Sequence, residues 1–141
     1  MRADLASDRQ ILRISGADRQ GFIHGLVTND VAPDRLTYAA LLTPQGKYLA
    51  DFFLYQTEDA IFVDAKADQA PSLIQRLSMY KLRADVTIEA LETPVYRGTG
   101  TAPQGAYPDP RDPSLGWRYY GTLQAEPAGI DWEALRVAAS V

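Results

Sequence analysis

Two apolar runs separated by a short polar turn restrict the fold of this chain more than any other feature. Residues 36–42 and 48–55 are rich in leucine, phenylalanine and tyrosine, and each has the length of a β-strand. Between them lies the turn Thr43-Pro44-Gln45-Gly46, in which the proline presets the first corner and the glycine permits a positive φ. The sequence therefore predicts an antiparallel β-hairpin.

In other stretches, the apolar residues recur at the spacing that is typical of strands or of helices. Strands are expected at residues 10–14, 60–65, 83–91, 93–97 and 117–120, and helices at residues 15–27, 69–82 and 131–139. This order of elements predicts an α+β fold, in which helices pack against a mostly antiparallel sheet.

The first of these helices has two specific features. Ser15-Gly16-Ala17-Asp18 has the spacing of a capping box, in which both polar side chains bind free backbone amides. Gly21 and Gly25 lie four residues apart, so that both would fall on one face and let another backbone approach closely.

The domain organisation is predicted from one unusual stretch. Residues 98–116 are crowded with glycine and proline and indicate a long loop. We expect an N-terminal subdomain over residues 1–97, then this loop, then the start of a following subdomain over residues 117–141. Because the last helical pattern reaches Val141 without a terminating glycine, we expect the chain to be a piece of a longer protein.

The composition excludes several kinds of site. The chain has no cysteine and one histidine, which excludes disulfides, thiolate nucleophiles, cysteine-bound clusters and multi-histidine metal centres. We therefore assign no catalytic residue and no metal ligand. Fourteen basic and 18 acidic residues give a net charge of -4, which argues against direct binding of nucleic acid.

The same sequence predicts the compartment. No apolar run approaches the roughly 20 residues of a membrane span. The first 16 residues lack the apolar core of a secretory signal. We expect no membrane partner and a cytoplasmic protein.

Asp51 is the one charged residue in the second strand of the predicted hairpin. Because an unpaired buried charge is costly, this carboxylate needs either an open edge or a partner. One interpretation is an ion pair with a neighbouring arginine. The other is recognition of a ligand with paired N–H donors, such as a pterin or guanidine edge, because one carboxylate accepts both.

Three blocks of sequence carry a family resemblance. They read ISGADRQGFIHGLVTNDV, YAALLTPQGKYLADFFLY and DPRDPSLGWR, in this order. They resemble the YgfZ branch of the folate-binding superfamily that also contains the glycine-cleavage T-protein. The likeness runs from about residue 12 to about residue 118, and it is greatest to bacterial proteins related to the mitochondrial iron-sulfur assembly factor of this branch.

The resemblance implies a tetrahydrofolate-binding architecture and a role in assembling or maintaining iron-sulfur enzymes, including radical enzymes that modify tRNA. The implied partners are folate and iron-sulfur client or assembly proteins. By their match to the family motifs, the implied site-lining residues are Asn29, Asp30, Gln45, Gly46, Lys47 and Asp51. A purely structural interpretation of the same residues is a helix exit and a tight hairpin turn.

The sequence departs from its family in two places. The T-protein has two adjacent aspartates in the strand that corresponds to residues 49–52, and the first of them is linked to catalysis; Ala50 stands at that position here. YgfZ relatives also carry a later K-G-C-Y-x-G-Q-E motif, which these residues do not contain, so the resemblance implies that the chain is the N-terminal portion of such a protein.

Three hypotheses follow from the sequence. The first is a tetrahydrofolate-binding protein that supports iron-sulfur enzymes without being an enzyme itself. The second is a folate-dependent aminomethyltransferase of T-protein type, against which Ala50 counts. The third is a protein-interaction module with a vestigial folate pocket.

Overall fold

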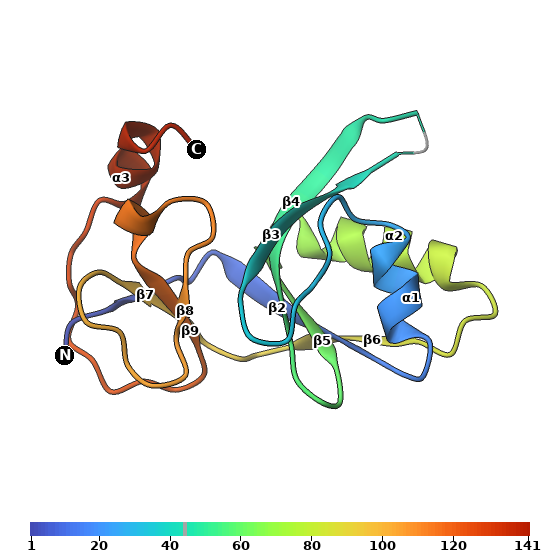
Figure 1. Cartoon of the computed structure of the whole chain (residues 1–141), viewed down its shortest axis with the longest axis horizontal. Helices are drawn as coiled ribbons and strands as arrows, with labels where there is room; N and C mark the ends of the chain where they lie inside the picture. The colour runs from blue at the N-terminus through green and yellow to red at the C-terminus, as the bar shows by residue number, and fades with distance from the viewer. Residues whose placement is uncertain (44) are drawn as a thin grey trace. The chain divides into compact units, whose positions relative to one another are not determined.

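The computed structural model describes residues 1–43 and 45–141, and it has the predicted α+β architecture (Figure 1). The strands are β1 (Asp4–Leu5), β2 (Arg9–Ser15), β3 (Thr37–Leu42), β4 (Tyr48–Gln56), β5 (Ile61–Lys66), β6 (Thr87–Leu91), β7 (Val95–Gly98), β8 (Tyr107–Pro108) and β9 (Trp117–Tyr120). The helices are α1 (Arg19–His24), α2 (Ala70–Lys81), the short 3-10 helix η1 (Pro113–Leu115) and α3 (Trp132–Ala138). The described strands form two antiparallel sheets.

Residues 8–92 form one compact unit around a five-stranded sheet with the order β3-β4-β5-β2-β6. Alternation along β2 sends Leu12 and Ile14 to one face of this sheet, where both are fully buried. Ile23 of α1 and Leu73 and Leu77 of α2 join the same apolar cluster. Both helices therefore cover one face of the sheet, as Figure 1 shows.

The predicted hairpin is present as β3 and β4. Thr37 pairs with Leu54 and Ala40 pairs with Asp51, and the register shifts between Leu41 and Leu42. Pro44, which the sequence places at the first corner of the turn, lies outside the described residues.

The first helix differs from its prediction. It covers only Arg19–His24, and its N-cap residue Asp18 makes no side-chain capping bond. The Asp18 carboxylate instead accepts the backbone N–H of Asp85 at 2.7 Å, and the Asp85 carboxylate accepts the N–H of Ala17 at 3.1 Å. The predicted capping box is wrong because a distant residue, Asp85, binds the Asp18 carboxylate through its N–H and accepts the Asp18 N–H at its carbonyl oxygen at 3.1 Å.

The close approach of another backbone, which was predicted at Gly21 and Gly25, occurs at Gly16. Nothing lies within 4 Å of a Cβ built on Gly21, and a Cβ on Gly25 would meet only backbone of its own helix, at 3.5 Å or more. Gly16 has a φ of +112°, and a Cβ there would lie 2.1 Å from the carbonyl oxygen of Asp85. The glycine that the packing requires therefore precedes the helix.

The second helix, α2, is close to its prediction. Pro71 lies in its first turn, where a missing N–H costs little. It ends at Lys81, and the C-cap residue Leu82 has a φ of 42°. The following strand β6 begins at Thr87 and not at residue 83, because the chain between them turns through hydrogen bonds from Ala84 N–H to Lys81 and from Val86 N–H to Ala84.

The second unit combines residues 1–7 with residues 93–141. Its sheet has the order β1-β7-β9-β8. At its centre, a Cβ on Gly98 would lie 2.4 Å from the ring of Trp117, which is buried. As predicted, a helix follows Asp131, whose side chain accepts the backbone N–H of Ala134 at 3.0 Å.

The boundaries of these two units differ from those of the predicted subdomains. The predicted subdomains cover residues 1–97 and 117–141, whereas β7 and β9 pair with each other inside one unit. The predicted loop at residues 98–116 contains β8 and η1. The ladder between β7 and β9 is long-range in sequence, and local composition does not reveal it.

The part of the chain that the structure describes contains no helix long and apolar enough to span a membrane. In the same residues, no three acidic or histidine side chains come together in a way that could hold a metal ion.

Candidate functional site

Asp51 and Asn29 are connected through Tyr38 on strand β3. The Tyr38 hydroxyl donates a hydrogen bond to the Asp51 carboxylate, and the Asn29 side-chain amide donates to the Tyr38 carbonyl oxygen at 2.9 Å. Because Ala40 pairs with Asp51 in the hairpin, Tyr38 lies diagonally across from Asp51. The partner of Asp51 is therefore a phenol and not the arginine that the structural interpretation expected.

A second tyrosine also contacts this carboxylate. Burial raises the pKa of Tyr48, and the negative charge and hydrogen bond of Asp51 raise it further. The sign of this effect shows that the ionised carboxylate favours the neutral phenol, because the phenolate would repel it. Asp51 is thus a half-buried hydrogen-bond acceptor beside two phenol groups.

Aromatic residues follow Asp51 along the same face of the sheet, and Phe53 and Tyr55 among them are buried. Tyr38 and Phe53 have ring centroids 5.3 Å apart at an interplanar angle of 52°. Tyr55 and Phe62 stack at 4.9 Å and 9°. Alternation along β4 places Asp51, Phe53 and Tyr55 on the face opposite the helices. A flat ligand with N–H donors on one edge is the chemistry that a carboxylate among aromatic rings suits best.

Asp30 lies at the exit of the first helical region, in agreement with the purely structural interpretation. Its carbonyl oxygen accepts a hydrogen bond from the Thr37 hydroxyl at 3.2 Å. Its carboxylate is 79% exposed and lies 4.0 Å from Nδ1 of His24. The side chain of Asp30 thus faces solvent beside the single histidine.

Gln45, Gly46 and Lys47 lie in the hairpin turn and are all exposed. The Gly46 N–H donates to the Thr43 carbonyl at 2.9 Å, and Gly46 has a φ of 87°. Lys47 precedes β4 and lies four positions before Asp51, which corresponds to about 13 Å of extended chain. Five of the six predicted residues therefore fall into two groups, one at the Tyr38 connection and one at the hairpin tip, while Asp30 lies apart beside His24.

Sequence reasoning missed a second carboxylate on the same face. Asp64 of β5 pairs with Phe53 in the ladder and is fully buried. Arg9 binds it through Nε at 2.7 Å and also donates to the Asp64 carbonyl oxygen at 2.7 Å. The Arg9 guanidinium lies 5.7 Å from the centre of the Phe53 ring. The argument applied to Asp51, a lone charge in an apolar strand, could have found Asp64 too.

Proteins with similar sequences include mitochondrial iron-sulfur cluster assembly factors. The chain is 30% identical over 142 residues to the protein named iron-sulfur cluster assembly factor IBA57 homolog, mitochondrial, of Mycosarcoma maydis, with 83% of this chain and 35% of the relative covered. It is 28% identical over 128 residues to the protein of the same name from Pyricularia oryzae, covering 78% of this chain and 33% of the relative. The chain spans about a third of the length of these curated relatives. No protein-family profile matches it.

A solved structure has the same fold. The chain superposes on the glycine cleavage system aminomethyltransferase T from Bartonella henselae with a TM-score of 0.61 and 18% identity, covering 67% of this chain and 27% of the other. These comparisons confirm the predicted resemblance to the fold of the T-protein and to the mitochondrial iron-sulfur assembly factors. The narrower assignment to the YgfZ branch stays a prediction.

The prediction of a cytoplasmic protein is wrong. The relatives are named as mitochondrial proteins, which points to the mitochondrion and away from the cytoplasm. The absence of an apolar N-terminal core does not distinguish these two compartments, because mitochondrial targeting segments are amphipathic and not continuously apolar.

Proposed function

We propose that this chain acts in iron-sulfur cluster assembly, as the part of an assembly factor that has the T-protein fold. The observation that carries the proposal is the likeness to the fungal relatives, which extends over 83% of this chain and whose name states that role. The T-protein-like fold of this chain supports the proposal, because the resemblance places the assembly factors and the T-protein in one superfamily. The cluster is a cargo in this proposal, handled together with partner assembly proteins.

The ligand in this proposal is tetrahydrofolate, bound on the sheet face that contains Asp51. The carboxylate is half-buried, so it is reachable and still partly shielded from water. A pterin ring offers adjacent N–H donors that one carboxylate accepts together, and the partly exposed ring of Tyr38 offers aromatic surface beside it. These residues fit the ring portion of the ligand.

The hairpin tip suits the other end of such a ligand. Lys47 is an exposed cation about 13 Å along the strand from Asp51. A carboxylate tail of an elongated ligand is the group that an exposed ammonium attracts. Asn29 holds the backbone of Tyr38 and in this way positions the phenol that binds Asp51.

The proposed activity is binding and not aminomethyl transfer. Where the T-protein resemblance places a carboxylate linked to catalysis, this chain has Ala50, which has no ionisable group. The clients that we propose for the assembly role include radical enzymes that modify tRNA, as the resemblance implies.

The assembly role is tested by the proteins that this chain captures. A tagged chain is incubated with mitochondrial extract, and its partners are compared with those of a tagged glycine-cleavage T-protein, which has the same fold and a different role. We expect iron-sulfur assembly proteins to be enriched on this chain and not on the T-protein. Equal recovery on both baits, or recovery of glycine-cleavage components alone, would contradict the proposal.

A further inference from the structure

Tyr48 lies on the same face of the sheet as Asp51, although the two residues are three positions apart in β4. Regular alternation would send residues at such a separation to opposite faces. In the hairpin, however, Leu41 pairs with Ala50. Its neighbour Leu42 pairs with Tyr48, so that β4 has one extra residue between the two pairs. This bulge returns Tyr48 to the face of Asp51.

The hydroxyl group of Tyr48 has three polar neighbours. It forms hydrogen bonds with the Asp51 carboxylate, the Asp51 backbone N–H and the Gln69 side chain. Burial and the Asp51 carboxylate raise the pKa of Tyr48, whereas the Asp51 N–H and the Gln69 side chain lower it. Groups that lower the pKa of a phenol donate hydrogen bonds to its oxygen. One hydroxyl group therefore joins an acceptor and two donors.

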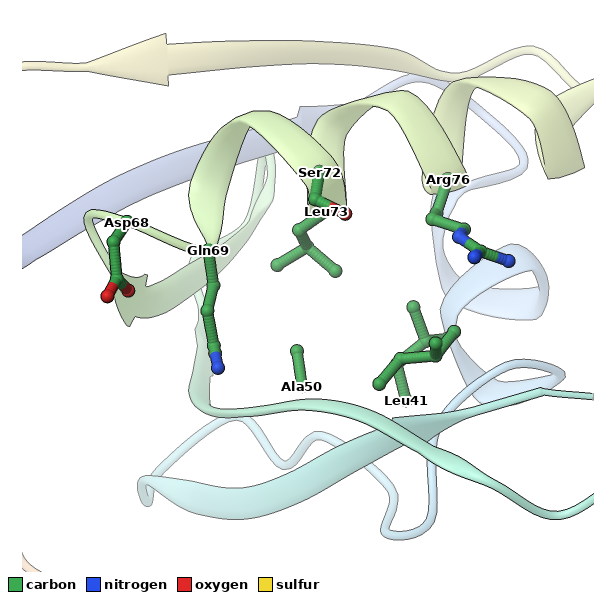
Figure 2. Close-up of a pocket in the computed structure, with 8 residues that line it drawn as sticks. Leu41, Ala50, Asp68, Gln69, Ser72, Leu73 and Arg76 are labelled. Carbon is green, nitrogen blue, oxygen red and sulfur yellow. The ribbon is translucent and has the colours of Figure 1, made fainter.

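Gln69 is available for this contact because it does not cap its helix. It is the N-cap residue of α2, but its side chain makes no capping bond. The side chain instead extends from the start of α2 toward β4, where it lines a small pocket together with Ala50 (Figure 2). The ladder between β4 and β5 starts at Phe52, one residue beyond Asp51. The hydroxyl of Tyr48 thus lies at the end of β4 that β5 does not cover.

Tyr48 is held less firmly than Tyr38, the other phenol at Asp51. The backbone of Tyr38 is bound by Asn29, and its ring lies 5.3 Å from the ring of Phe53. Tyr48 is 55% exposed, and no aromatic ring of the described residues stacks on it. Moving the Tyr48 ring into solvent therefore exposes little new apolar surface, whereas moving Tyr38 would break its packing.

We propose that the Tyr48 hydroxyl occupies the place of a ligand, and that a planar ligand with an amide edge displaces it. The inference rests on the proposed function, because it concerns the same ligand face. In such an edge, a ring N–H and an amino group are donors, and a neighbouring carbonyl oxygen is an acceptor. The Asp51 carboxylate accepts from both donors, while the Asp51 N–H or the Gln69 amide donates to the carbonyl oxygen.

The displaced hydroxyl makes the site selective. A ligand has to replace the hydrogen bonds that Tyr48 makes with one acceptor and two donors. A flat ring that lacks either the donors or the acceptor leaves one of these groups without a partner, and this is unfavourable. Tyr48 is therefore a specificity-determining residue of the ligand face.

The probe for this proposal is isocytosine, whose edge has this pattern, titrated into the isotope-labelled whole chain and followed by amide chemical shifts. 2-Aminopyrimidine keeps the amino group and lacks the ring N–H and the carbonyl oxygen. We expect saturable shifts at the Asp51 and Gln69 amides with isocytosine, with a dissociation constant on the order of millimolar, and binding of 2-aminopyrimidine about tenfold weaker. Equal binding of the two compounds, or no shifts at these amides, would overturn the proposal.

Two matched substitutions identify the displaced group. Tyr48→Phe removes only the hydroxyl, and it should tighten binding of isocytosine about tenfold, because one charge-assisted hydrogen bond no longer competes. Tyr38→Phe removes the other phenol hydroxyl at Asp51, from a residue that stays in place, and it should not tighten binding. A merely structural role of Tyr48 predicts weaker binding by its variant. Unchanged or weaker binding by the Tyr48 variant, or equal tightening by both variants, would contradict the displacement.

Titration of the same variants with tetrahydrofolate separates this inference from the proposed function. We expect Tyr48→Phe to tighten its binding as well. Tetrahydrofolate binding that the Tyr48 substitution does not tighten would contradict the displacement and leave the folate proposal standing. Tightened binding of isocytosine without any binding of tetrahydrofolate would support the displacement and remove folate as the ligand.

Discussion

The Nε of Arg9 lies 2.7 Å from the Oδ1 of Asp64, and the Asp64 side chain is completely buried. The two residues belong to paired strands, β2 and β5, in the middle of the five-stranded sheet. Because Arg9 also donates to the Asp64 backbone carbonyl, one guanidinium satisfies two acceptors in that strand. This pair joins the two neighbouring strands through a buried charged contact.

Removing Arg9 should therefore be costly. Arg9→Met removes the guanidinium that binds the buried Asp64 carboxylate, and we expect it to lower the free energy of unfolding by about 3–5 kcal/mol. Urea denaturation measures this change. The control is Arg13→Met in the same strand, because the Arg13–Glu89 pair is half-exposed and should contribute less than about 1 kcal/mol. Similar losses in both variants would contradict the role assigned to the buried pair.

Two glycines near the first helix should respond to alanine in opposite directions. Gly16→Ala should destabilise the chain by about 2 kcal/mol or more, because φ is +112° and the new Cβ would meet the Asp85 carbonyl oxygen at 2.1 Å. Gly21→Ala should stabilise it by about 0.5–1 kcal/mol, because the site is helical and open. Thermal and urea unfolding of both variants provide the comparison. A destabilising Gly21 variant or a neutral Gly16 variant would be inconsistent with this geometry.

Asp4 should make the stability of the chain depend on acid pH. Burial raises its pKa, but hydrogen bonds from the Gly129 backbone, the Trp132 indole, and the Ile130 and Ala128 backbones outweigh this and hold the pKa below its ordinary value of 3.8. A lowered folded-state pKa contributes stability that is fully present above the unfolded-state pKa of about 3.9 and is lost as pH falls through the folded value.

Asp4→Asn removes the charge that these donors bind. We expect it to lower the free energy of unfolding near pH 7, and the difference from the unmodified chain should shrink as the pH is lowered through 4 toward 3. Urea denaturation at a series of pH values measures this difference. Asp34→Asn, at an exposed position, serves as the matched substitution. A difference that stays constant over this pH range would show that the Asp4 charge is not involved.

Much of the sheet could be predicted because its signals are local. The β3–β4 hairpin, β5 and the strand Arg9–Ser15 all follow from apolar runs bounded by turn residues. The α3 cap at Asp131 was also predictable, because the acceptor and its donor at Ala134 lie three residues apart. In each case, the residues that decide the structure are neighbours in the sequence.

The features that could not be predicted depend on distant partners. Asp18 has the spacing of a capping residue, yet it binds the backbone of Asp85, 67 residues away. Asp4 binds the backbone of residues 128–130, and the two-residue strand β1 pairs with β7 across most of the chain. Local sequence patterns carry no information about such pairings. For the same reason, the boundary between the two units could not be predicted from the sequence.

The candidate site could also be predicted only in part. The sequence identified Asp51 as a carboxylate that needs a partner, and the structure supplies Tyr38 from the neighbouring strand. The resemblance suggested six lining residues, of which Asn29 and Asp51 meet at Tyr38 while Gln45, Gly46 and Lys47 lie in the turn. Which residues of a motif come together depends on the strand register, and this becomes visible only in the folded chain.

The most direct test of the central claim is a calorimetric titration of the chain with tetrahydrofolate, repeated with Asp51→Asn and Asp59→Asn. Asp59 is an exposed acid of the same unit and provides the matched control. We expect saturable binding by the unmodified chain and by the Asp59 variant. Binding by the Asp51 variant should be about tenfold or more weaker, because charge-assisted hydrogen bonds to the ligand are lost. Equal affinity of the Asp51 variant, or no binding by the folded chain, would contradict the account.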